Sequence, residues 1–175
     1  IIPEAVKSGE AVLLDGKGYY KRITTPEAFL DCQRHMLYNE NMSQRLTENN
    51  FSGAAIGEPV YIGENVSVMS GSVVESGSVI DNNAVVKGGK VNGYVGIGSV
   101  VSERCDINSA VVCRGAVLDS GVKCGEYSVI GEKAHIASEA VIEKEVGIWS
   151  GKTVEKGARL YENVKISSDS RLVID

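Results

Sequence analysis

The sequence has few aromatic residues, prolines and histidines. Its 175 residues include one tryptophan, two phenylalanines, three prolines and two histidines. Two histidines per chain are too few for a zinc site with three histidine ligands. No apolar run approaches the roughly 20 residues that a membrane-spanning helix needs, and no signal peptide is visible. We therefore expect a cytoplasmic protein without a membrane partner.

Positive charge is also scarce. Eighteen basic residues face 23 acidic ones, which gives a net charge of −5. The basic residues form no stripe, and this argues against a nucleic-acid partner. The four cysteines, Cys32, Cys105, Cys113 and Cys124, form no CxxC pair and have no zinc-ligand spacing. We expect all four to be reduced and structural.

Glycine and a six-residue repeat are what the chain has in abundance. It contains 20 glycines. Between Ala110 and Leu172 an aliphatic residue, or once a cysteine, returns at every sixth position, with a mostly small or apolar residue two positions before it. These positions are Val112, Leu118, Cys124, Ile130, Ile136, Ile142, Ile148, Val154, Leu160, Ile166 and Leu172. An earlier series has the same spacing, at Ile56, Ile62, Val68, Val74, Ile80 and Val86.

A period of six predicts a β-solenoid with three faces per coil. In a strand, residues two apart point the same way, so each hexad buries two side chains before a turn changes direction. Gly115, Gly121, Gly151 and Gly157 stand where that turn needs a positive φ. Three faces give coils of about eighteen residues that stack about 4.8 Å apart. We predict an all-β parallel β-helix over residues 51–175 with about seven coils.

Three places depart from the regular pattern. The register slips between Lys87 and Ile107, which predicts a bulged or looped corner or a tolerated insertion. Lys152 occupies a nominally inward position, where a buried charge is costly, so we expect a local distortion that lets its ammonium reach water. Trp149 directly follows the inward Ile148 and should face outward.

Residues 1–50 do not follow the repeat. A short helix is expected at the start, then two short strands joined by a glycine-containing turn, and then a helix from Pro26 to about Leu37. Thr25 can cap that helix. Its apolar stripe is expected at Phe29, Cys32 and Met36, with Leu30 and Leu37 as further candidates. We expect this helix to cap or flank the first coil.

Two segments carry a family resemblance. Gly18, Tyr19, Ile23, Thr25, Pro26 and Glu27 match a motif that ends the catalytic domain of sugar nucleotidyltransferases. The stretch 146–160, VGIWSGKTVEKGARL, resembles the β-helix of their mannose-1-phosphate guanylyltransferase-like members. The resemblance implies that residues 1–50 are the end of a catalytic α/β domain plus a helix and linker. It also implies that residues 51–175 form a left-handed β-helix of hexapeptide repeats.

The resemblance implies an assembly or regulatory piece of an NDP-sugar pyrophosphorylase that is not catalytic by itself. The chain then holds no catalytic, cofactor-binding or metal-binding residue, and its partners are its own catalytic domain and further copies of itself. The parent binds NTP and sugar 1-phosphate, and an active parent needs Mg²⁺. Two departures stand out: Arg22 replaces the family's metal-binding aspartate, and Thr24 replaces a glycine. Arginine repels a cation.

The alternative hypothesis is a hexapeptide-repeat acyltransferase that uses acyl-CoA between subunits. That reaction usually requires a histidine near the acceptor as general base. His135 precedes the inward Ile136 and should point outward, where it needs an orienting partner and a neighbouring subunit. His35, on the predicted helix, is expected to be solvated or packed. The candidate contact surface comprises Trp149, Phe29 and Met36.

Overall fold

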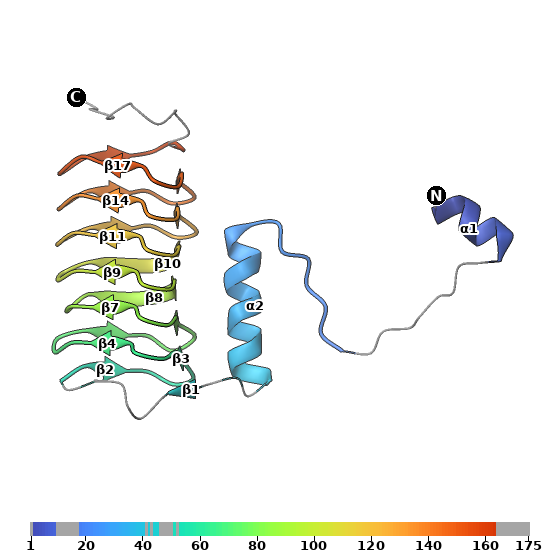
Figure 1. Cartoon of the computed structure of the whole chain (residues 1–175), viewed down its shortest axis with the longest axis horizontal. Coiled ribbons are helices and arrows are strands. Elements are labelled where there is room, and N and C mark those ends of the chain that lie inside the picture. The colour runs from blue at the N-terminus through green and yellow to red at the C-terminus, as the bar shows by residue number, and fades with distance from the viewer. Residues whose placement is uncertain are drawn as a thin grey trace.

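A computed structural model describes residues 2–9, 18–40, 42, 44–45, 51 and 53–163. The first of the two strands predicted before the Pro26 helix, the repeat positions Ile166 and Leu172, and the C-terminal run lie outside this part of the chain. The second predicted strand is absent, because residues 18–24 are described and form no strand. The short N-terminal helix is present as α1 (Ile2–Ser8) and stands apart from the β-helix in Figure 1.

The body of the protein is a left-handed parallel β-helix of short strands, as predicted (Figure 1). Its first face carries β2 (Ala55–Ile56), β5 (Val73–Val74), β8 (Lys90–Val95), β10 (Asp106–Val112), β12 (Lys123–Cys124), β15 (Val141–Ile142) and β18 (Arg159–Leu160). The second face carries β1 (Gln44–Arg45), β3 (Tyr61–Ile62), β6 (Val79–Ile80), the later parts of β8 and β10, β13 (Val129–Ile130) and β16 (Gly147–Ile148). The third face carries β4 (Ser67–Val68), β7 (Val85–Val86), β9 (Val100–Val101), β11 (Val117–Leu118), β14 (His135–Ile136) and β17 (Thr153–Val154). Coils begin at β2, β5, β8, β10, β12 and β15, and β18 starts another.

The core is a stack of the predicted aliphatic positions. The second residue of almost every strand points inward and is buried, as Ile80, Leu118, Ile130 and Ile142 show with no exposed area. Small residues fill the position two before each of them; most are alanine, valine or serine and are buried as well. Outward residues occupy the first position of each strand, so the surface chemistry of each face can be assigned from the sequence once the register is known.

The register slip predicted between Lys87 and Ile107 is a shortened coil. Val79 pairs with Tyr94, fifteen residues on, whereas Val129 pairs with Gly147, eighteen residues on. The chain runs around this corner as the continuous strand β8, without a turn. The expectation of a looped or inserted corner is therefore wrong. The expected bulge is present in β10, where the pairing shifts between Asn108 and Ala110.

The turns use more residue types than glycine. Gly115, Gly121, Gly151 and Gly157 have the predicted positive φ. Equivalent turns place non-glycine residues in the same region, and these are Tyr127, Lys133, Glu139 and Glu145, with φ between 55° and 63°. Such residues adopt this conformation at a cost of about 1–2 kcal/mol each. Their presence indicates that the stacked coils impose the turn.

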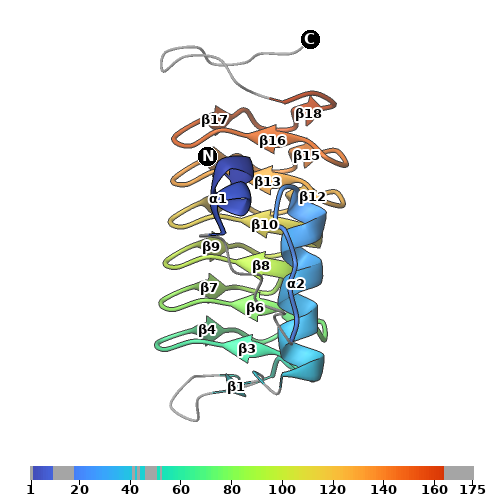
Figure 2. The same ribbon diagram turned by 90° about the vertical axis from the view of Figure 1, so that its right-hand side faces the viewer.

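Helix α2 (Pro26–Asn39) lies along the second face, with its length parallel to the stack of coils (Figures 1 and 2). It therefore flanks several coils. The side chain of Thr25 caps it by accepting a hydrogen bond from the Ala28 amide at 3.1 Å, as predicted. Leu30 and Leu37 are its buried residues.

Three residues of the predicted apolar stripe of α2 are less buried than expected. Phe29, Cys32 and Met36 are only half-buried, because the face against the β-helix also includes two polar residues. Gln33 Nε2 donates to the carbonyl oxygens of Gly77 and Gly93, at 2.7 and 3.2 Å. Arg34 donates to Ser109 Oγ at 3.0 Å and to Asn92 Oδ1 at 3.4 Å. Hydrogen bonds to the β-helix, two to backbone carbonyl oxygens and two to side chains, thus share this face with leucine packing.

The β-helix continues regularly at Lys152, so the predicted distortion is absent. The carbonyl oxygen of Lys152 accepts from the His135 amide at 2.8 Å, in the same pattern that joins Ala134 to Val117 one coil below. The Lys152 side chain is half-buried. A lysine in this setting keeps its stem against apolar neighbours while its ammonium stays in water.

Two glycines allow the turn conformation and the tight stacking to be tested separately. Gly157 has φ +70° and open space around an added Cβ, whereas a Cβ on Gly131 would lie 2.5 Å from the Ser150 backbone nitrogen. We expect Gly157→Ala to lower the free energy of unfolding by about 1 kcal/mol and Gly157→Asn by less, because Asn tolerates positive φ. At Gly131 the order reverses: Ala costs about 2–3 kcal/mol and Asn costs more. Urea unfolding followed by circular dichroism measures all four variants, and the same order at both sites would contradict this explanation.

Candidate functional site

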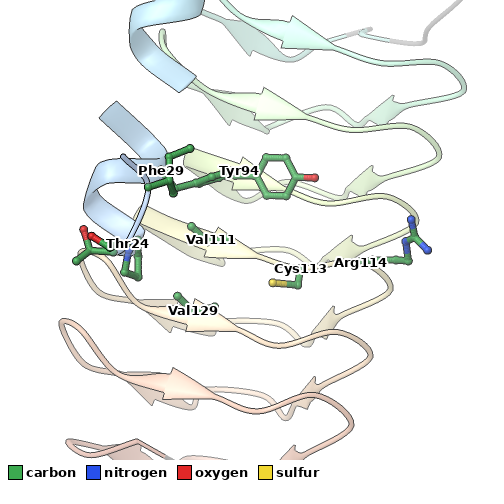
Figure 3. Close-up of a pocket in the computed structure, with 10 residues that line it drawn as sticks. Thr24, Phe29, Tyr94, Val111, Cys113, Arg114 and Val129 are labelled. Carbon is green, nitrogen blue, oxygen red and sulfur yellow. The ribbon is translucent and has the colours of Figure 1, made fainter. Parts of the chain in front are cut away.

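The surface is hollowed where the second face meets the corner that leads to the third face. Two adjoining hollows, of about 540 and 810 Å³, share Tyr94, Cys113, Arg114 and Val129. We call them together the corner groove. The close-up in Figure 3 shows one of them, with Phe29 and Thr24 on the α2 side, Val111 and Val129 on the strands, and Arg114 at the corner.

The two ends of the corner groove come from distant parts of the sequence. Residues 23–26, which lead into α2, line one end together with Phe29. Glu132, Trp149 and Ser150, from the corners of later coils, line the other. Trp149 is 57 % exposed, so it faces outward as predicted. Of the candidate contact residues, Trp149 and Phe29 line the groove and Met36 does not. Their contact with a partner stays a prediction.

Tyr94 is held rigidly in the floor of the groove. Its hydroxyl donates to Asp81 Oδ2 at 2.9 Å. Phe29 packs edge-on against its ring with centroids 5.4 Å apart and planes at 90°. Burial, followed by the hydrogen bond to Asp81, raises the pKa of Tyr94 well above its ordinary value. The phenol therefore stays protonated.

Arg114 provides the positive charge of the groove. It is exposed, and within the described part of the chain its guanidinium has no recorded ion pair or hydrogen bond. Glu132, the carboxylate among the lining residues, lies 3.4 Å from the Lys133 ammonium. Burial raises the pKa of the Cys113 thiol, which keeps this neighbour of Arg114 neutral.

A second group of polar residues stands on the third face. His135 on β14 lies directly above Val117 on β11. His135 Nε2 is 3.0 Å from Asp119 Oδ2, and the two side chains are 46 % and 36 % exposed. We call this pair the His135–Asp119 dyad. The orienting partner that His135 needs is therefore present within one chain.

The sequence reasoning missed Asp119 although a signal was available. Asp119 follows β11 directly, and His135 begins β14 one coil later. Both are outward positions of the same face. A full coil is eighteen residues and neighbouring outward positions are two residues apart, so a separation of sixteen residues places His135 one coil on and one outward position back from Asp119. Stacked coils of eighteen residues therefore place these two residues side by side.

The backbone of Asp119 is fixed from both sides. Its amide donates to the Ile136 carbonyl oxygen at 2.9 Å, and the Cys105 thiol donates to the Asp119 carbonyl oxygen at 3.0 Å. Desolvation raises the pKa of Cys105 to about 11. Burial also raises the pKa of Cys124 strongly. Both thiols are thus protonated near neutral pH, and the structural role predicted for Cys124 is confirmed by its burial.

The dyad has the geometry of a general base and its orienting group. If Nε2–H donates to the carboxylate, Nδ1 carries the free lone pair that can accept a proton. His35 is not part of this arrangement, since its ring stacks on Tyr19 with centroids 3.5 Å apart. Within the described residues, no cluster of three or more His, Cys, Asp or Glu side chains could hold a metal ion.

The two departures from the nucleotidyltransferase motif lie close together but differ in setting. Arg22 is exposed and does not line either hollow. Thr24 lines the corner groove beside Pro26.

In the part of the chain that the structure describes, no helix is long and apolar enough to cross a membrane.

No protein-family model matches the chain, and no curated protein matches its sequence. Among solved structures, PerB from Caulobacter crescentus, in complex with CoA and GDP-perosamine, is 24 % identical with a TM-score of 0.36, over 63 % of this chain and 50 % of that one. The acetyltransferase domain of PglB from Neisseria gonorrhoeae is 22 % identical with a TM-score of 0.29, over 61 % and 48 %. The UDP-N-acetylglucosamine acyltransferase of Campylobacter jejuni is 15 % identical with a TM-score of 0.32, over 66 % and 72 %. The chain thus spans about half the length of the first two, and the likeness concerns the fold.

The raised pKa of Cys105 predicts a loss of stability at alkaline pH. The unfolded thiol ionises near its ordinary pKa of 9 and the native one near 11. Between pH 9 and 11 the unfolded state loses its thiol proton while the native state still holds it. The contribution of Cys105 to the free energy of unfolding is therefore complete below pH 9 and is lost as the pH rises from 9 to 11. We expect Cys105 to contribute up to about 3 kcal/mol of this fall.

The measurement is urea unfolding at several pH values between 8 and 11. Cys105→Ser keeps a donor for the Asp119 carbonyl oxygen but removes the thiol, so its stability should fall less steeply with pH than that of the wild type. Ser128→Ala, a buried change that removes no group titrating between pH 8 and 11, is the control and should keep the wild-type slope. An unchanged slope in Cys105→Ser would contradict the assignment.

Proposed function

We propose that the chain is the β-helix of a hexapeptide-repeat acyltransferase, in which His135 is the general base for transfer from acyl-CoA to a hydroxyl or amine. The observation that carries this proposal is the 3.0 Å contact between His135 Nε2 and Asp119 Oδ2 on an exposed face. Nucleotide-activated sugars carry such acceptor groups. Both acyl-CoA and its acceptor are compounds of the cytoplasm, where we expect the protein to act.

The dyad supplies what the reaction requires of a base. Asp119 orients the ring through Nε2, and Nδ1 accepts the proton of the acceptor as its oxygen or nitrogen attacks the thioester carbonyl carbon. The tetrahedral intermediate then breaks the carbon–sulfur bond. The imidazolium returns the proton to the leaving sulfur, so the products are the acylated acceptor and free CoA.

A second copy of the chain would complete the site. The third face presents Val85, Val100 and Val117 in the outward row that leads to His135, and all three are half-buried. An apolar row on a flat sheet favours packing against another protein surface. A neighbouring copy seated there would shield the dyad from bulk water. This arrangement supports a homo-oligomer as the active form.

Replacing either member of the dyad should slow acyl transfer without unfolding the protein. We expect His135→Ala to lower kcat by about 10²–10⁴-fold, the range typical of general-base catalysis. Asp119→Asn keeps the shape and should lower kcat by about tenfold or more. The assay follows release of the CoA thiol from acetyl-CoA with a panel of amino-sugar nucleotides. His35→Ala is the matched control, and full activity in His135→Ala would contradict the proposed base.

A different observation favours a second candidate function, the assembly or regulatory β-helix of a sugar-1-phosphate nucleotidyltransferase. The segment with the family motif leads into α2, which is attached to the β-helix because Gln33 and Arg34 make four hydrogen bonds to its strands and to the turn at Gly77. Such a connection would fix a preceding domain relative to the coils. The parent would then need Mg²⁺, although Arg22 stands where the family has an acidic ligand.

Pyrophosphate release distinguishes the two candidates. The intact protein is incubated with a panel of NTPs and sugar 1-phosphates, with and without Mg²⁺. Mg²⁺-dependent release that survives His135→Ala would support the assembly function and would leave the dyad as a surface ion pair. Acyl transfer that is lost in His135→Ala would support the enzyme.

A further inference from the structure

The corner groove has features of a ligand site outside the His135–Asp119 dyad. Its two hollows, of about 540 and 810 Å³, are wide and open to solvent, so a ligand would lie along the surface of the corner. They are separate from the His135–Asp119 dyad, since neither residue lines them.

Aromatic rings and valines form one part of its lining. Tyr94 lies half-buried in the floor, fixed by Phe29 and by its hydrogen bond to Asp81. Trp149 stands at the far end with more than half of its surface exposed. Nucleobases stack well on exposed faces of tyrosine and tryptophan.

The charge of the groove selects for an anion. Arg114 has no recorded partner among the described residues, and its charge acts on the neighbouring Tyr94. Glu132 is compensated by Lys133 at 3.4 Å. The lining residues thus carry one positive and one negative charge, and Glu132 already has a cationic neighbour, so Arg114 is the charged group of the groove that is left to meet an anionic ligand. A guanidinium matches the paired oxygens of phosphate better than an ammonium does.

We infer that the corner groove binds the nucleoside diphosphate part of a larger ligand, with the base on the aromatic rings and the diphosphate on Arg114. Two sources share this chemistry: the nucleotide end of CoA and a nucleotide-activated sugar. The inference goes beyond the proposed acyl transfer, because it holds whether or not His135 is catalytic.

Trp149 allows direct observation, since it is the single tryptophan of the chain. The 175-residue chain is titrated with ADP and UDP, with fluorescence excited beyond the absorption band of the nucleotides. We expect saturable quenching. Adenosine, which lacks the diphosphate, should bind at least tenfold more weakly than ADP. Isothermal calorimetry repeats the titrations independently of the fluorophore.

Variants separate the two halves of the site. Arg114→Gln should weaken ADP binding by about tenfold and leave adenosine binding unchanged, whereas Tyr94→Ala should weaken both. Arg159→Gln is the matched control, because Arg159 pairs with Glu143 on the first face. Its affinity for ADP should equal that of the wild type, and circular dichroism checks that each variant is folded.

Two further ligands identify the source. Tighter binding of CoA than of ADP would assign the groove to the coenzyme, and tighter binding of UDP-N-acetylglucosamine than of UDP would assign it to a nucleotide sugar. No saturable signal with any of these ligands, or equal ADP affinity in Arg114→Gln, would overturn the inference. His135→Ala should leave nucleotide affinity within twofold, so failure of the groove and failure of the proposed catalytic base give different results.

Discussion

The stacking of parallel strands at a fixed spacing is the constraint on which the rest of this structure depends. Each coil must place its inward residue directly above that of the coil below, because backbone hydrogen bonds such as Val129 N to Val146 O join successive coils. The six-residue step follows from this requirement. So does the burial of Ile130, Ile136 and Ile142 without exposed area. An unbroken apolar column would be impossible if any face slipped by one residue.

The same constraint explains which features the sequence predicts well. The inward residues, the glycine turns and the outward Trp149 all follow from counting in sixes, and the structure confirms them. Two features of the fold could not be predicted from the six-residue repeat. Non-glycine turns such as Glu139 and Glu145 lack the local signal, because their conformation is imposed by neighbouring coils. The shortened coil at β8 changes the length of the repeat itself, so Val79 meets Tyr94 at a spacing that no regular period provides.

The candidate sites were harder to predict than the fold because they combine residues from separate coils. The His135–Asp119 dyad depends on one coil length, which the sequence supplies, and only the outward step between neighbouring positions was overlooked. The corner groove depends on where α2 lies. The helix itself was predictable from Thr25 and Pro26, but its orientation was not, since Gln33 and Arg34 look like solvent-exposed residues in the sequence. Their hydrogen-bond acceptors lie 44 to 75 residues away.

The shortened coil also links the fold to the groove. Gly93 lies within β8 at φ +143°, and the carbonyl oxygen of this residue accepts a hydrogen bond from Gln33. The next residue, Tyr94, then carries its ring to the outer surface beside Phe29. Loss of one turn thus places an aromatic ring at the edge of the contact with α2. One coil below, the same corner is a regular turn at Gly77, and its carbonyl oxygen also accepts a hydrogen bond from Gln33. The helix therefore packs against both kinds of corner, and what the shortened coil contributes to the groove is the position of Tyr94 beside Phe29.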